Sequence, residues 1–174
     1  LSHGFFHSLL KMKHPIEFLF LPHFKSIPIE NGDTSSQSQV CPFVQGETFY
    51  LQTTFSKELE ELKKKGTKVL TPLLDLQNGL EEAEKPLLET AAQMGVSRKT
   101  AKIAFEKALV RQTKCLAKMK EIGKKALVEL ENDPEKMAVV IFGRSYNGFV
   151  EEAHMGIPRK LASRGILCIP FDFL

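Results

Sequence analysis

Short apolar runs alternate along the chain with longer amphipathic stretches. The apolar runs are typical of strands buried on both faces, and they lie at 18–21, 68–74, 137–142 and 166–169. The amphipathic stretches predict helices at 1–12, after the segment 41–46 to about 65, and at 79–94, 98–131 and 151–164. Strands that alternate with helices predict an α/β fold, with a Rossmann-like or flavodoxin-like parallel sheet and helices on both faces.

The two helices from Gly79 to Glu131 are too long for one crossover, so we expect an inserted helical pair. The chain then divides into three segments. Residues 1–77 form the first part of the α/β layer with a polar surface loop at 30–40, residues 78–133 the helical pair, and residues 134–174 the second part. The last strand stops as soon as it is complete, so we expect the second part to be truncated and the chain to be a piece of a longer protein.

Charge and cysteine content narrow the class of protein. With 24 basic and 21 acidic residues the net charge is +3, which does not by itself favour a nucleic-acid partner. The three cysteines have no short regular spacing, which fits a reducing cytoplasm better than a disulfide framework. No apolar run approaches the roughly 18 residues that a membrane-spanning helix needs.

The longest helix, 98–131, carries two distinct faces. One is an apolar stripe that predicts burial, and it consists of Ala101, Ala104, Phe105, Ala108, Leu109, Cys115, Leu116, Met119, Ile122, Ala126, Leu127 and Leu130. A basic row lies beside it and consists of Lys107, Arg111, Lys114, Lys118 and Lys125. This row is either a solvated lysine face or a phosphate-contacting surface. No aromatic residue interleaves with it, so stacking on single-stranded nucleic acid has no support.

Cys41 is the first candidate for chemistry. It follows the polar loop and precedes a helix, and a helix N-terminus favours the thiolate that acts as nucleophile or metal ligand. The alternative is a cysteine packed as a small apolar residue. Cys115 and Cys168 fall in an apolar stripe and an apolar strand, so we expect both to be structural.

The second candidate is the turn from Gly143 to Asn147, at the carboxyl end of a buried strand. Ligands of open parallel sheets bind at that edge. Arg144, Ser145, Tyr146 and Asn147 suit an anion or a carbonyl oxygen, unless the segment is an ordinary strand-to-helix turn. His23 follows the first strand and should lie on the same edge, either as a ligand or as a structural histidine.

The chain contains neither common phosphate loop, nor a His-Glu pair at helical spacing, nor a nucleophile elbow, nor a Cys-x-x-Cys pair. It therefore holds no complete catalytic constellation, and we expect it to be inactive alone.

Six ordered blocks carry a resemblance to a known family. They are LSHG at 1–4, FLFLPH at 18–23, CPFVQG at 41–46, SRKTAKIAFEKAL at 97–109, NDPEKMAVVIFGRSYN at 132–147 and GIPRKLASRGILCIPFDFL at 156–174. Together they resemble the domain of unknown function in large CoA-substrate-specific enzyme activases, described as activators of (R)-2-hydroxyglutaryl-CoA dehydratase.

The resemblance implies a role linked to 2-hydroxyacyl-CoA dehydration. Proteins of this family resemble fusions of an ATPase-type activator with a segment similar to dehydratase subunits, which bind a four-iron four-sulfur (4Fe–4S) cluster through cysteines. Cys41 is the one ligand that carries over; His23 stands where some relatives have a cysteine, and the other ligands would lie outside this chain. The implied partners are a 2-hydroxyacyl-CoA dehydratase, or other domains of the parent chain, and a CoA ester. The alternative is a non-catalytic docking domain that binds a partner dehydratase through the basic helix face.

Overall fold

The computed structural model describes residues 2–12, 15–29, 38–148 and 150–174. The chain forms two compact units, Leu1–Leu109 and Val110–Leu174. The long helix α6 (Arg98–Glu131) begins in the first unit and ends in the second. Helices and parallel strand pairs make up both units, which confirms the α/β class. The division into 1–77, 78–133 and 134–174 stays a prediction, and residues 30–37 of the expected loop lie outside the described part.

The first unit contains two layers of helices around paired strands. Its elements are α1 (Ser2–Leu10), β1 (Phe18–Phe20), β2 (His23–Ser26), α3 (Pro42–Thr54), α4 (Ser56–Lys64), β3 (Lys68–Leu70), β4 (Leu73–Asp75), the 3-10 turn η1 (Leu80–Ala83), α5 (Glu84–Gln93) and the start of α6. Strand β1 pairs with β3 and β2 with β4, both in parallel.

The two strand pairs form one ribbon that is interrupted by prolines. Phe18 lies opposite Lys68 and His23 opposite Leu73, so the register is the same on both sides of the gap. Hydrogen bonds from Leu21 N to Leu70 O and from His23 N to Pro72 O, both 2.8 Å, bracket it. The apolar runs predict strands that end at Pro22 and Pro72, and β1 and β3 do end next to these prolines, because a proline removes one N–H donor. Since proline permits extended backbone, a second pair follows in the same register.

Thr48 compensates for the missing donor. In the parallel ladder, Lys68 N donates to Glu17 O, and the same bond repeats every second residue. The fourth residue after Lys68 is Pro72, whose nitrogen would therefore donate to the carbonyl of Leu21. Pro72 has no N–H there. Instead the buried Thr48 hydroxyl of α3 lies 3.4 Å from Leu21 O and donates to Pro22 O at 2.9 Å. This contact ties α3 to the middle of the ribbon.

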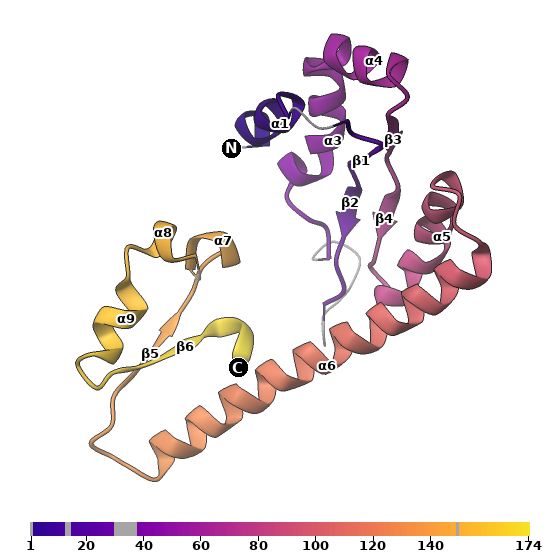
Figure 1. The fold of residues 1–174 in the computed structure, drawn as a ribbon. Coiled ribbons are helices and arrows are strands. Elements are labelled where there is room, and N and C mark those ends of the chain that lie inside the picture. The colour runs from indigo at the N-terminus through magenta and orange to yellow at the C-terminus, as the bar shows by residue number, and fades with distance from the viewer. Residues whose placement is uncertain (1, 13–14, 30–37, 149) are drawn as a thin grey trace. The chain divides into compact units, whose positions relative to one another are not determined.

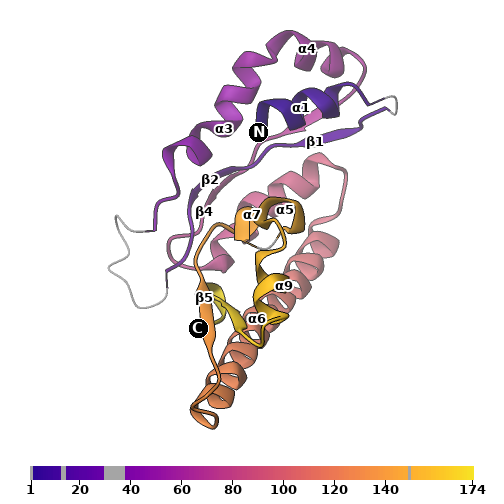
Figure 2. The same cartoon turned by 90° about the vertical axis from the view of Figure 1, so that its left-hand side faces the viewer.

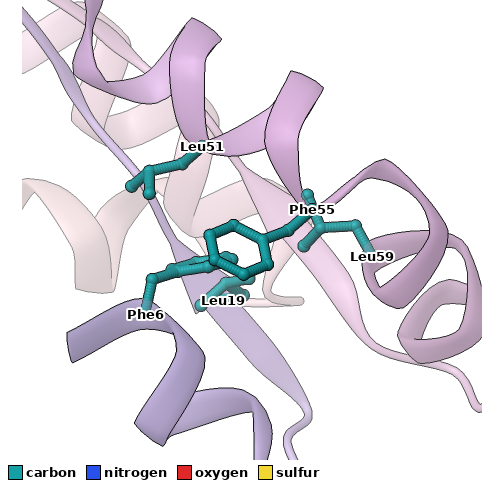
Figure 3. Close-up of a cluster of buried hydrophobic side chains, with 5 residues drawn as sticks. All are labelled: Phe6, Leu19, Leu51, Phe55 and Leu59. Atoms are coloured by element: carbon teal, nitrogen blue, oxygen red, sulfur yellow. The ribbon is translucent and has the colours of Figure 1, made fainter. Parts of the chain in front are cut away.

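Helices cover the ribbon on both faces, as a parallel sheet requires. Leu19 and Phe24 are five positions apart and therefore point to opposite faces. On the face of Leu19, α1, α3 and α4 close a core of Phe6, Leu19, Leu51, Phe55 and Leu59, which Figure 3 shows. On the other face Phe24 packs with residues of β4, η1, α5 and the start of α6. Figures 1 and 2 both show α3 and α5 on opposite sides of the strands.

Helix ends in this unit follow the signals in the sequence. Gly66 and Gly95 adopt positive φ angles of 98° and 80° directly after α4 and α5. The N–H of Thr67 then bonds to Leu62 O and that of Val96 to Ala91 O, the hydrogen bonds of a left-handed glycine cap. Ser97 begins α6, because its Oγ accepts from Thr100 N at 3.1 Å.

The second unit holds the end of α6 and one parallel strand pair. Its further elements are β5 (Ala138–Ile141), α7 (Ser145–Gly148), α8 (Glu151–His154), α9 (Ile157–Ala162), β6 (Leu167–Pro170) and the 3-10 turn η2 (Phe171–Phe173). Strand β5 pairs in parallel with β6, with Val139 opposite Cys168. The described strands thus form two-stranded pairs, where we had expected one continuous sheet.

The helix expected at 151–164 is broken in two. Met155 and Gly156 both adopt left-handed backbone conformations, with φ of 54° and 70°, between α8 and α9. Gly156 favours the break since it has no Cβ, and its N–H donates to Nδ1 of His154 at 3.0 Å. Pro158 in the first turn of α9 then suits a new helix start.

Most of the apolar stripe of α6 is not buried. Ala101 is buried and Phe105 half-buried, but Leu116, Ile122 and Leu127 are 42%, 46% and 43% exposed. The expectation of a buried face along the whole helix was therefore wrong for its second half. An amphipathic pattern shows which side of a helix can be covered, and it does not show which residues cover it.

One close backbone approach fixes α6 within the second unit. Gly123 is buried in the middle of the helix, and a Cβ built on it would collide with the carbonyl oxygen of Phe173 and lie 2.6 Å from the Phe173 carbonyl carbon. Only glycine permits η2 to lie this close to the helix.

The Thr48 contact predicts the effect of removing one hydroxyl. Thr48→Val keeps the side-chain shape but leaves the Leu21 and Pro22 carbonyls without that donor, so it should lower the free energy of unfolding by about 1–3 kcal/mol. Thr48→Ser keeps the donor and should cost less. Urea unfolding of the full chain measures both; a valine variant as stable as the serine variant would contradict the assignment.

The Gly123 contact predicts a substitution effect of unexpected sign. In an exposed helix interior Gly→Ala stabilises by about 1 kcal/mol. Gly123→Ala should instead lower the midpoint of thermal unfolding, because Phe173 must move. Ala104→Gly, at an exposed position of the same helix, calibrates helix propensity alone. If Gly123→Ala raised the midpoint, the close approach would be wrong.

Candidate functional site

The backbone around Cys41 is held against β2. Residues Ser38–Val40 run antiparallel to the far edge of that strand, with Ile27 N bonded to Ser38 O at 2.9 Å and Val40 N to Lys25 O at 3.1 Å. Cys41 follows directly and is the N-cap residue of α3. Helix α3 then runs back over β2 to the Thr48 contact. Two anchors, one at each end, therefore fix the position of Cys41.

The Cys41 thiol is half-buried and not in a disulfide. Its carbonyl accepts from Val44 N and Gln45 N, so α3 begins at this residue, and Pro42 occupies the first turn. Gln45 steadies the turn by donating from Nε2 to Val40 O at 2.7 Å. This geometry confirms that Cys41 lies at a helix N-terminus.

His23 lies on the side of the ribbon that α3 covers. Its ring packs against Phe49 of α3, with centroids 4.3 Å apart. Lys25, two residues later in β2, pairs with Asp75 of β4 at 2.6 Å, and the register of the two strands shifts between Phe24 and Ser26. The Lys25 ammonium, and then the Ser26 hydroxyl, hold the pKa of Asp75 below its ordinary value of 3.8. His23 and the Cys41 turn thus belong to the same layer of the first unit.

The Gly143 turn lies in the second unit. It leads from β5 into the short helix α7, where Asn147 N and Gly148 N bond to Arg144 O at 2.8 Å. Arg144 and Asn147 are exposed, whereas the side chains of Ser145 and Tyr146 lie outside the described part. Gly143 and Asn147 line a cavity of about 240 Å³ together with His154, a residue that the sequence pattern did not single out. In a single parallel sheet, Cys41 and this turn would share one rim and lie within roughly 15 Å of each other, about the span of a few neighbouring strands. Since they belong to different units, that distance stays a prediction.

The other two cysteines differ from each other. Cys168 is half-buried in β6, and its Sγ lies 3.6 Å from Pro158 O, which fits a structural role. Cys115 is exposed on α6, so the expectation that it packs in a buried stripe was wrong. Cys115 does lie on the apolar side of the helix, but within the described residues nothing buries that side at this position.

The basic row of α6 is partly neutralised. Glu121 pairs with Lys125 at 2.7 Å and with Lys118 at 3.0 Å, and these hydrogen bonds, with Lys125 first, lower the pKa of Glu121 to about 2. Arg111 and Lys114 have no ion-pair partner among the described residues. Within the second unit, Arg111 and Lys114 are thus the described residues of the basic row whose positive charge no carboxylate offsets.

Cys41 is a single possible ligand rather than a metal centre. Within the described ranges, no three or more His, Cys, Asp and Glu side chains gather closely enough to hold a metal ion. A 4Fe–4S cluster needs about four ligands. The described residues therefore fit at most one part of such a site. In the same ranges, no helix is long and apolar enough to cross a membrane.

The comparisons with known proteins give one match. No curated protein and no solved structure is significantly similar to the chain. A family profile described as the CoA enzyme activase uncharacterised domain (DUF2229) matches residues 1–174, the whole chain. This agrees with the resemblance carried by the six sequence blocks. The chain therefore belongs to the family of the CoA enzyme activase uncharacterised domain.

Proposed function

We propose that this activase-type domain serves 2-hydroxyacyl-CoA dehydration and that Cys41 supplies one ligand of an iron–sulfur cluster completed by residues outside this chain. The observation that carries the proposal is the position of Cys41, a half-buried, unbridged thiol at the N-cap of α3 in a family of CoA enzyme activases. Such a cluster, when bound, would supply low-potential electron transfer. The cytoplasmic location expected from the cysteines is part of the same proposal.

The chain's own contribution would be to hold the thiolate in place. The pairing of Ser38–Val40 with β2 and the Thr48 contact fix both ends of the segment, so Cys41 has little freedom to move when a ligand bond forms. Cys41 is half-buried, so it remains partly accessible to a partner surface.

Within this proposal, the Gly143 turn would line the substrate site of the parent protein. The exposed guanidinium of Arg144 and amide of Asn147 suit a phosphate or carbonyl oxygen of a CoA ester. Ser145 and Tyr146 complete the same turn as further substrate- or anion-binding candidates. The parent protein would then act as the activator of a 2-hydroxyacyl-CoA dehydratase or a related lyase, with this domain contributing part of the site.

The first experiment measures iron and sulfide in the full-length protein, purified without oxygen. Cys41→Ala should remove most of the cluster, because loss of one of about four ligands leaves the iron open to exchange. Cys115→Ala should leave the iron content unchanged. Alkylation gives a second readout: Cys41 should be protected in the cluster-bound protein and reactive after the cluster is removed, while the exposed Cys115 reacts in both. A full cluster in Cys41→Ala would show that the ligand assignment is wrong.

A second candidate is a non-catalytic docking domain that binds a partner dehydratase through α6. The observation in its favour is that the part of this helix in the second unit exposes both Arg111 and Lys114 and apolar residues such as Leu116. Exposed apolar and basic side chains on one element suit a protein partner with an acidic surface.

Charge reversal tests the docking candidate. Arg111→Glu with Lys114→Glu should slow association with the purified cognate dehydratase by about tenfold at low salt, and added salt should reduce the difference. Lys57→Glu with Lys64→Glu on α4 is the matched control and should have no effect. Equal effects of the two pairs would mean that net charge, and not the α6 face, governs the association.

A further inference from the structure

Helix α3 and the strands beneath it line an open cavity that none of the preceding assignments uses. Its volume is about 530 Å³, and its walls include His23 and Lys25 of β2, Gln45 and Phe49 of α3, and Leu73 of β4. All of these lie in the first unit. Small-molecule sites have volumes of about 300–1,000 Å³, so the cavity is large enough for a ligand. Figure 1 shows α3 alongside β2.

His23 is the unusual wall of this cavity. The residue is only 9% exposed, and its ring lies against Phe49. Within the described part of the chain neither ring nitrogen has a hydrogen-bond partner. No fully buried side-chain nitrogen or oxygen there lacks a partner, so a ring nitrogen of His23 without one is at least slightly accessible, and His23 is a wall of the cavity. Buried polar groups normally have a hydrogen-bond partner. An imidazole that has none within the protein is therefore suited to hydrogen-bond a ligand in the cavity.

The charge of the walls selects the kind of ligand. His23 and Lys25 both line the cavity, although the register of β2 with β4 shifts between Phe24 and Ser26. The Lys25 ammonium donates one of its three protons to Asp75, whose carboxylate offsets the lysine charge, and its other protons stay available. No carboxylate is among the described lining residues. The polar end of the cavity therefore offers N–H donors that suit an acceptor such as a carboxylate.

The remaining walls are apolar and accessible. Phe49 is 66% exposed and Leu73 58%, although both lie next to the buried His23. Covering such apolar surface is favourable by about 25 cal/mol per Å². A ligand that only carried charge would leave these walls in water, and a purely apolar ligand would leave the His23 nitrogens and Lys25 without a partner.

We propose that this cavity binds small organic carboxylates that carry a short apolar chain. The His23 imidazole and the Lys25 ammonium hold the carboxylate, and the chain lies against Phe49 and Leu73. Cys41 is not among the walls, so the assignment does not depend on the iron–sulfur proposal.

Hexanoate is the probe, and the full chain labelled with ¹³C at histidine is the sample. The ring signals of His23 should shift in a saturable way, with a Kd in the millimolar range, about −4 kcal/mol at 1 mM. Acetate has the charge without the chain, and hexanol has the chain without the charge. Each should bind at least about fivefold more weakly than hexanoate, because each satisfies only one half of the site.

Variants of α3 provide a matched pair. Phe49→Ala should weaken hexanoate binding by at least about fivefold, because it removes an apolar wall. Phe43→Ala lies on the same helix, is 89% exposed and is not a wall, so it should have no effect. Lys25→Met and His23→Gln should each weaken binding of hexanoate and leave that of hexanol unchanged. If one of these two variants fails to fold, the other variant and Phe49→Ala still test the proposal.

Three results would overturn the proposal. The first is a His23 signal that does not saturate with hexanoate. The second is hexanol binding as tightly as hexanoate, since His23 and Lys25 would then not recognise the carboxylate. The third is Phe43→Ala weakening binding as much as Phe49→Ala, which would indicate adsorption to exposed aromatic side chains in place of a defined cavity.

Discussion

The gap that Pro22 and Pro72 leave in the first-unit ribbon is the constraint on which the rest of that unit depends. A parallel pair must satisfy its backbone groups and cover both of its faces. Here Pro72 lacks the donor that the Leu21 carbonyl would meet, and the Thr48 hydroxyl approaches that carbonyl and bonds to that of Pro22. This requirement fixes α3 across the ribbon. The cover of the core, the place of Cys41 and the walls of the cavity all follow from the position of α3.

Local signals predicted the elements that depend on neighbouring residues only. Gly66, Gly95 and Ser97 mark helix ends because a positive φ angle or a side-chain cap acts within a few residues. Continuity across Pro22 was not predictable in this way. It depends on a second strand fifty residues later with its own proline in register, and on a hydroxyl from a third element. No local window contains all three.

The same distinction applies to the candidate sites. The sequence placed Cys41 at a helix N-terminus, since Pro42 and the preceding polar loop are local signals. It also singled out His23, but Phe49 and Leu73, which turn His23 into the wall of a cavity, have no signal beyond being apolar. Cys115 shows the converse. Its position in an apolar stripe predicted burial, and yet the residue is exposed, because periodicity carries no information about the covering surface.

Cys41 and the cavity are separate assignments that meet at Lys25. The carbonyl of Lys25 accepts from Val40, the residue before Cys41, while its ammonium points to Asp75 beside the cavity. The backbone of Lys25 thus holds the segment before Cys41, and its side chain is held by β4 next to His23. The two roles use different groups of one residue, so a change of the Lys25 side chain removes the ammonium from the cavity and leaves the backbone pairing that positions Cys41. The position of α3 is therefore common to both assignments, whereas the chemistry of each is its own.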